Sequence, residues 1–152
     1  MKFKYQIYIF LILFLLPNCG YQPLYSSKGQ NFSIGEVNID GEKYLVSYFE
    51  TQIKRLQNQN DDSYDLEIFL DSTKNTISKD KKGTPSIYNL SISAKIIYKQ
   101  AGKDFKSKTF VQQTNYNNKD NKFDLKRLEK NIEKQLLNKI IEDFIFFTQS
   151  II

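Results

Sequence analysis

The chain has 152 residues, no histidine and one cysteine, and its 22 basic and 17 acidic side chains give a formal net charge of +5. That length is enough for one domain with one hydrophobic core. The positive charge is mild and does not indicate a nucleic-acid partner. Without histidine, a zinc, copper or iron site and the usual general base or nucleophile pair are disfavoured. We therefore expect no metal, no cofactor and no enzyme activity.

The first nineteen residues have the layout of an export signal. Lys2 and Lys4 precede an apolar run at 7–16, which is too short for a confident membrane span. The lone Cys19 follows at the expected cleavage boundary, which predicts a bacterial lipoprotein signal whose thiol is lipidated. Asn18 stands where such signals usually have a small residue, and the alternative is an ordinary signal or short anchor with an incidental cysteine. We expect a lipoprotein signal peptide at 1–18, a lipidated tether at 19–31 and a single domain at 32–152.

In the first half of that domain, apolar residues follow strand-like spacing, then helix-like spacing, then strand-like spacing again. Residues 32–39 alternate apolar and polar side chains with a slip at Gly35, which predicts a strand with a bulge. Residues 42–58 have one apolar stripe at helical spacing, and residues 64–71 return to clean alternation. The sequence therefore predicts a strand, an amphipathic helix and a second strand.

The second half is predicted to contain two more strands and a long helix. Strands are expected at 86–100 and 105–116, joined by a tight turn at 101–104, and a basic, mobile loop is expected at 78–85. A helical stripe runs from 122 to 149. Its tail, Phe144–Phe147, is apolar all round, and we expect it either to reach a partner or to be buried in its own core.

The order strand, helix, three strands, helix predicts an α+β fold. We expect a two-layer sandwich, in which two helices cover one face of a four-stranded mixed or antiparallel sheet (β-α-β-β-β-α). Because a helix connects the first two strands, they are expected to pair in parallel, whereas the later hairpin is antiparallel.

Several segments resemble one known family. The start Cys19-Gly20-Tyr21-Gln22-Pro23-Leu24-Tyr25 is similar to the mature N-terminus of LptE, the lipopolysaccharide-assembly lipoprotein, in its α-proteobacterial form. Weaker similarity is found in the strand segment 88–94, the turn 101–103, the residues 115–117 and the helix segment 136–140. The resemblance covers the mature chain in element order, but only the N-terminal motif is specific in its residues.

The resemblance implies an envelope function. LptE-like proteins are lipid-anchored to the periplasmic face of the outer membrane, plug the β-barrel LptD, help that barrel to assemble, and bind lipopolysaccharide without acting as enzymes. The resemblance also implies basic lipopolysaccharide contacts in the loop between the second and third strands, and at the start of the last helix. The residues of this chain at those two places are Lys79, Lys81, Lys82, Lys119 and Lys122.

Three alternatives stay open. The five lysines can be ordinary solvated loop charge. The chain can be a lipoprotein subunit of another envelope lipid-transport complex, such as an auxiliary component of an ABC-type transporter. A secreted hydrolase would need a pair of buried carboxylates in a concave site, or a Ser-Lys pair. We expect no such carboxylate pair.

Overall fold

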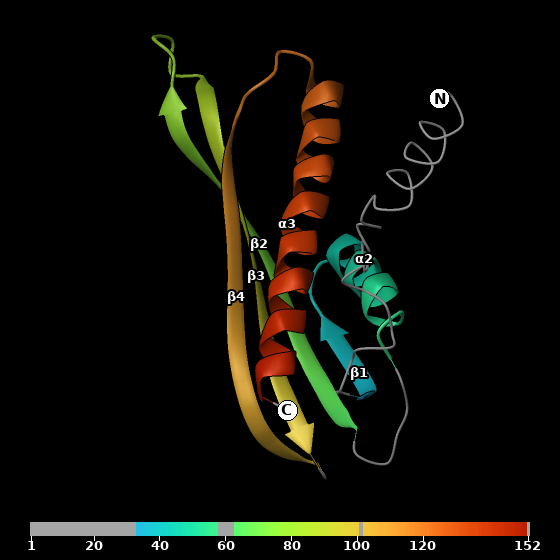
Figure 1. Ribbon diagram of the computed structural model, residues 1–152. Helices are drawn as coiled ribbons and strands as arrows, with labels where there is room; N and C mark the ends of the chain where they lie inside the picture. Colours follow the sequence, from blue (N-terminus) through green and yellow to red (C-terminus); the bar gives the residue numbers. More distant parts are fainter. Residues whose placement is uncertain (1–32, 58–62, 101, 152) are drawn as a thin grey trace, which may run out of the picture.

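The computed structural model describes residues 33–57, 63–100 and 102–151. Two helices lie against one face of an open four-stranded sheet (Figure 1). The elements in chain order are β1 (Ile34–Asp40), α2 (Lys43–Ile53), β2 (Tyr64–Lys79), β3 (Pro85–Gln100), β4 (Lys103–Asn117) and α3 (Lys122–Ile151). The predicted α+β class and element order are confirmed.

The sheet has the order β1-β2-β3-β4. The β1–β2 pair is parallel and the β3–β4 hairpin is antiparallel, as the connections predicted, and β2 pairs with β3 antiparallel as well. The register between β1 and β2 shifts between Ile34 and Val37, which is where the sequence predicted a bulge. The sheet is therefore mixed, with its single parallel pair at the β1 edge.

One hydrophobic core lies between the sheet and the helices. Alternate residues of β2 and β3 point into it, because successive side chains of a strand face opposite sides. From the helices, Phe49 of α2 and Phe144 of α3 are fully buried, and the Tyr98 ring of β3 packs 6.2 Å from that of Phe144 between ring centroids. The Tyr98 hydroxyl shares a hydrogen bond of 2.8 Å with Thr148, so the largest buried polar group has a partner. Burial raises the pKa of Tyr98 to about 12, although this hydrogen bond acts to lower it.

The first helix is shorter than the sequence predicted. It was expected over 42–58, whereas α2 ends at Ile53 and a turn follows at 54–56. Leu56 is still buried, because the turn folds it back onto the core. The apolar stripe therefore continued past the end of the helix that it predicted.

The second strand is longer than predicted. The expected strand ended at residue 71, and a mobile loop was expected at 78–85. Instead, β2 continues to Lys79 and pairs with β3 along its length, so that only a tight turn at 80–84 separates them. Polar residues on both faces hid this extension, since they remove the alternation that reveals a half-buried strand. The loop expected at 78–85 is therefore reduced to this turn.

The apolar tail of α3 packs mainly into its own core. Phe144 and Ile145 are buried, Phe147 is half-buried against Phe110, and Phe146 is 56% exposed. The second of the two expectations for this tail is therefore correct for most of its residues. The predicted signal, tether and turn residue 101 lie outside the described residues.

Candidate functional site

The five lysines singled out from the sequence gather at one end of the molecule. β2 ends and β3 begins at this end, and the pairing of Ile87 with Asn117 brings the end of β4 there as well (Figure 1). Asn118, which follows β4, donates its backbone N–H to Ser86 (2.9 Å) and its side-chain amide to Pro85 (2.7 Å). The segment that carries Lys119 and Lys122 therefore lies against the first residues of β3, next to the turn of the β2–β3 hairpin. We call this region the hairpin end.

A single aspartate shapes the tip of the hairpin. One carboxylate oxygen of Asp80 accepts hydrogen bonds of 2.8 Å from the backbone N–H groups of Lys82 and Thr84. Gly83 adopts a positive φ of 82°, which favours glycine in a turn of this kind. The turn leaves Lys81 and Lys82 exposed, and neither forms an ion pair within the described ranges. Two cations are thus presented by a defined turn.

A polar and aromatic cluster joins the hairpin to α3. The Glu129 carboxylate accepts hydrogen bonds from Lys74 (2.5 Å) and from the Tyr116 hydroxyl (2.7 Å). The Lys74 ammonium also lies 4.1 Å from the ring centroid of Tyr88, and the Tyr88 and Tyr116 rings are 5.6 Å apart between centroids. Burial and the bond to Glu129 raise the pKa of Tyr116. These contacts hold the hairpin against the start of the helix layer.

Two exposed apolar side chains lie at the hairpin end. Ile77 of β2 is 56% exposed and Phe123 of α3 is 74% exposed. Phe123 is fixed at the start of the helix because the Asn121 side chain accepts a hydrogen bond of 2.9 Å from its backbone N–H. Neither residue was predicted from the sequence, although for Phe123 the neighbouring polar cap Asn121 is a visible signal. They place apolar surface near the lysines.

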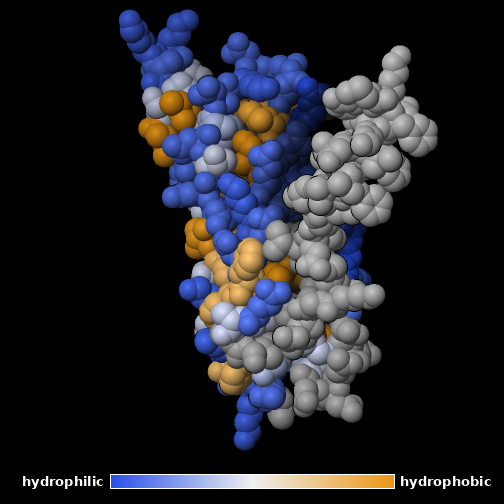
Figure 2. Space-filling view, in the orientation of Figure 1, coloured by the Kyte–Doolittle hydropathy of each residue, from blue (hydrophilic) through white to orange (hydrophobic). Residues whose placement is uncertain are grey.

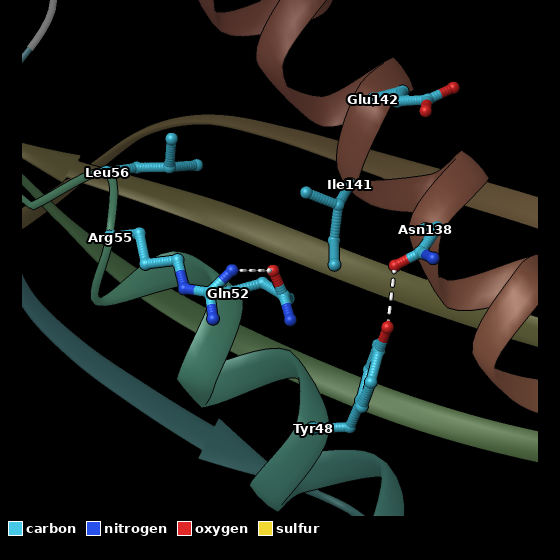
Figure 3. Close-up of a pocket in the computed structure, with 7 residues that line it drawn as sticks. All are labelled: Tyr48, Gln52, Arg55, Leu56, Asn138, Ile141 and Glu142. Atoms are coloured by element: carbon cyan, nitrogen blue, oxygen red, sulfur yellow. Dashed lines mark hydrogen bonds between the residues drawn. The ribbon is translucent and has the colours of Figure 1, made fainter. Parts of the chain in front are cut away.

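A groove of about 580 Å³ lies between the two helices (Figure 3). Tyr48 of α2 closes one part of it by donating a hydrogen bond of 2.9 Å to Asn138 of α3. Glu142 is the one carboxylate among the residues that line it, which are Tyr48, Gln52, Arg55, Leu56, Asn138, Ile141 and Glu142. This groove therefore offers no carboxylate pair for acid–base chemistry.

A smaller hollow of about 330 Å³ brings three carboxylates near one another. Glu42, Glu129 and Glu133 all line it, so carboxylates do converge in a concave place. Burial, followed by the charges of Glu42 and Glu129, raises the pKa of Glu133, while Lys130 acts to lower it. Glu42 is exposed, and Glu129 and Glu133 are only half-buried, so the hollow does not hold the buried carboxylate pair that a hydrolase would need. Sequence spacing alone did not predict the grouping, because it joins two turns of α3 to the start of α2.

Two features are absent from the described residues. Among residues 33–57, 63–100 and 102–151, no group of three or more His, Cys, Asp or Glu side chains could hold a metal ion. In the same ranges, no helix is both long enough and apolar enough to span a membrane.

The fold is similar to that of several bacterial lipoproteins. Rare lipoprotein B from Shewanella oneidensis has a TM-score of 0.54 and 13% identity, over 75% of this chain and 96% of that one. A minor lipoprotein from Acinetobacter baumannii has a TM-score of 0.55 and 11% identity, over 76% and 89%. Lipoprotein B from Nitrosomonas europaea has a TM-score of 0.54 and 16% identity, over 75% and 81%. No family model and no curated protein sequence matches the chain. At these identities the likeness establishes the fold.

Proposed function

We propose that this chain is a non-catalytic lipoprotein of the bacterial outer membrane, of the LptE type. In this role it is anchored on the periplasmic face through Cys19, plugs and helps to assemble an LptD-like β-barrel, and binds lipopolysaccharide. The observation that carries the proposal is a fold shared with rare lipoprotein B and related lipoproteins, in a chain that begins with a lipoprotein-like signal ending at Cys19.

The uncovered face of the sheet supports the plug role. The lumen of a membrane barrel is polar, so a plug needs a hydrophilic surface that forms hydrogen bonds. Asn89 of β3 donates a side-chain hydrogen bond of 2.8 Å to Asn115 of β4 on this face. Its neighbours Ser91, Ser93 and Gln113 are also polar. The opposite side of the molecule, which carries the helices, is also mostly hydrophilic with several apolar spots (Figure 2).

The hairpin end supports the lipid-binding role. Lipopolysaccharide carries phosphates next to acyl chains, and a site for it needs cations beside apolar surface. Lys81 and Lys82 provide exposed cations at the tip, with Lys79 at the end of β2. Lys119 and Lys122 lie on the neighbouring segment, and Ile77 and Phe123 add apolar surface.

Charge reversal tests the lipid-binding role. The variant Lys81→Glu/Lys82→Glu should bind lipopolysaccharide micelles at least about tenfold more weakly, because each substitution replaces attraction to the phosphates by repulsion. The control is Lys95→Glu/Lys103→Glu, which makes the same change in net charge at exposed positions away from the tip. Equal binding by both variants would remove the hairpin from the site.

Purification from membranes tests the partner. The tagged protein should copurify with an outer-membrane β-barrel at a one-to-one ratio. Recovery of inner-membrane transporter subunits without a barrel would instead support the role of an ABC-transporter auxiliary lipoprotein. Cys19→Ala should release the protein from the outer-membrane fraction, and unchanged fractionation of that variant would show that lipidation is not the anchor.

A further inference from the structure

A second basic region lies on the helix layer, apart from the tip of the hairpin. A hollow of about 550 Å³ opens between the start of α2 and the first turns of α3. Its lining is aromatic and basic and contains no carboxylate. The residues are Tyr44, Phe123, Lys126, Arg127, Lys130, Asn131 and Lys134. We call it the basic groove.

The cations of the groove are only partly neutralised. Arg127 pairs with Asp124 at 3.1 Å, but neither Lys126, Lys130 nor Lys134 forms an ion pair with any described residue. These three lysines follow at intervals of four along α3, where like charges destabilise a helix. An anion bound across them would relieve that repulsion.

Acidic side chains border the groove on one side. Glu42, Glu129 and Glu133 line the adjacent hollow, which shares Tyr44, Lys126 and Lys130 with the groove. Glu129 is already engaged by Lys74 and Tyr116. Glu129 is thus engaged from the hairpin side, whereas Glu42 and Glu133 lie beside Lys126 and Lys130 at one border of the groove.

Two aromatic side chains, Tyr44 and Phe123, line the groove beside the cations, and Tyr48 lies near its last lysine. Lys130 lies 5.4 Å from the ring centroid of Tyr44, and Lys134 lies 6.0 Å from that of Tyr48. Phe123, 74% exposed, stands at the rim. Exposed cations around an exposed aromatic ring are typical of surfaces that bind anionic membranes.

We propose that the basic groove binds the phosphate headgroups of anionic phospholipids in the membrane to which the chain is anchored. Lys126, Lys130 and Lys134 contact the phosphates, and Phe123 enters the interface. The segment from Cys19 to Ser33 spans at most about 50 Å when extended. Because α3 is about 45 Å long, this reach is enough for the lipid anchor and the groove to meet the same membrane. The membrane placement rests on the lipid anchor proposed above, whereas the preference for anionic lipid rests on the groove alone.

Lysine labelling in lipid nanodiscs tests this proposal. The full lipoprotein is reconstituted in two kinds of disc. One kind contains phosphatidylcholine alone, and in the other about one lipid in three is phosphatidylglycerol, which gives the disc a negative surface potential. A neutral reagent then acetylates the lysines, and mass spectrometry measures the rate at each position. Lys126, Lys130 and Lys134 should react about fivefold more slowly in the anionic discs. The exposed Lys95 and Lys103 should react at the same rate in both.

The outcomes separate failure of the groove from failure of the anchor. A protein that enters neither disc contradicts the anchor, whereas one that enters both with equal labelling overturns the groove. Protection confined to Lys79, Lys81 and Lys82, or protection by inorganic phosphate alone, would also overturn it. Protection seen only in native membranes with a partner protein would assign the groove to an acidic protein instead.

A cross-linking experiment provides a second readout. A photoreactive phosphatidylglycerol should label the start of α3, and the variant Lys126→Gln/Lys130→Gln/Lys134→Gln should lose about nine-tenths of that label, as expected for removal of three charge contacts. The matched control, Lys95→Gln/Lys103→Gln/Lys139→Gln, also removes three exposed cations and should keep the label. Equal labelling of the two variants, with circular dichroism showing both folded, would overturn the proposal.

Discussion

The two ends of the sheet are built differently. Where α2 and α3 cover it, β2 and β3 send Leu66, Ile68 and Ile96 into a closed core. At the hairpin end, β2 from Thr73 to Ile77 is exposed on both faces, and polar contacts around Glu129 attach it to α3. Buried area therefore stabilises the first region, and strand pairing with a few hydrogen bonds holds the second. Different parts of one protein commonly differ in local stability, and binding segments often come from the less stable part.

The largest contrast is expected within the last helix. Phe144→Ala should destabilise the fold by about 3–5 kcal/mol, because it removes a fully buried ring and leaves a cavity. Phe146→Ala, two residues away and 56% exposed in the native protein, should cost less than about 1 kcal/mol. Urea denaturation of both variants measures the difference. Similar losses would show that Phe146 is covered, which would revive the expectation of a partner at this tail.

Two glycines test the backbone of the two regions. At Gly41, with φ of 144°, an added Cβ would lie 2.5 Å from the Leu70 carbonyl oxygen, so Gly41→Ala should cost about 3 kcal/mol in strain and displacement. At Gly83, with φ of 82°, nothing lies within 4 Å of that position. Gly83→Ala should therefore cost about 1 kcal/mol, from the left-handed backbone alone. Thermal unfolding measures both losses of stability, and a larger loss for Gly83→Ala than for Gly41→Ala would contradict this prediction.

Loss of a buried hydrogen bond in the region covered by the helices should reduce stability by an intermediate amount. Tyr98→Phe removes the hydroxyl that bonds Thr148, and it should cost about 1 kcal/mol. Thr148 keeps its hydrogen bond of 2.8 Å to the Phe144 carbonyl, which limits the loss. Tyr64→Phe is the control, since Tyr64 is only half-buried. Chemical denaturation should show no more than a small change for the control, and equal changes would contradict the role given to the hydroxyl.

The attachment of the hairpin should show a local effect. Glu129→Gln weakens the contact with Lys74, and the global free energy of unfolding should fall by less than about 1 kcal/mol. Amide hydrogen exchange at 74–79 and 85–90 should nevertheless accelerate, because these strands depend on that attachment. Glu142→Gln, an exposed change on the same helix, should leave the exchange of those strands unchanged. Uniform acceleration across the sheet would mean that the two regions unfold together.

The smallest effect concerns pH. Burial raises the pKa of Glu133, so the folded state binds a proton more readily than the unfolded state, and ionisation of Glu133 reduces stability as pH rises above its unfolded pKa. Glu133→Gln should therefore raise the melting temperature by a degree or two at pH 7, roughly the effect of a few tenths of a kcal/mol. The gain should shrink as pH falls toward 4. A constant gain at both pH values would exclude this cause, and Glu142→Gln should show no gain.

The candidate site could be predicted only in part. The basic character of the segments around Lys81 and Lys119 is visible in the sequence, and the resemblance suggested their role. That they lie together depends on the pairing of Ile87 with Asn117, which no local pattern encodes. Lys126, Lys130 and Lys134 read as the solvated face of a helix, because nothing near them in the chain indicates that Tyr44 packs beside them.

The sequence by itself determined the element order, the α+β class, the bulge near Gly35 and the buried faces, because alternating and helical spacings are local and strong. Only the tertiary structure decided the end of α2, the length of β2 and the grouping of Glu42 with Glu129 and Glu133. The physical reason is the same in each case. Strand pairing and packing between distant segments set these features, and their free energy does not depend on the spacing of residues within one segment.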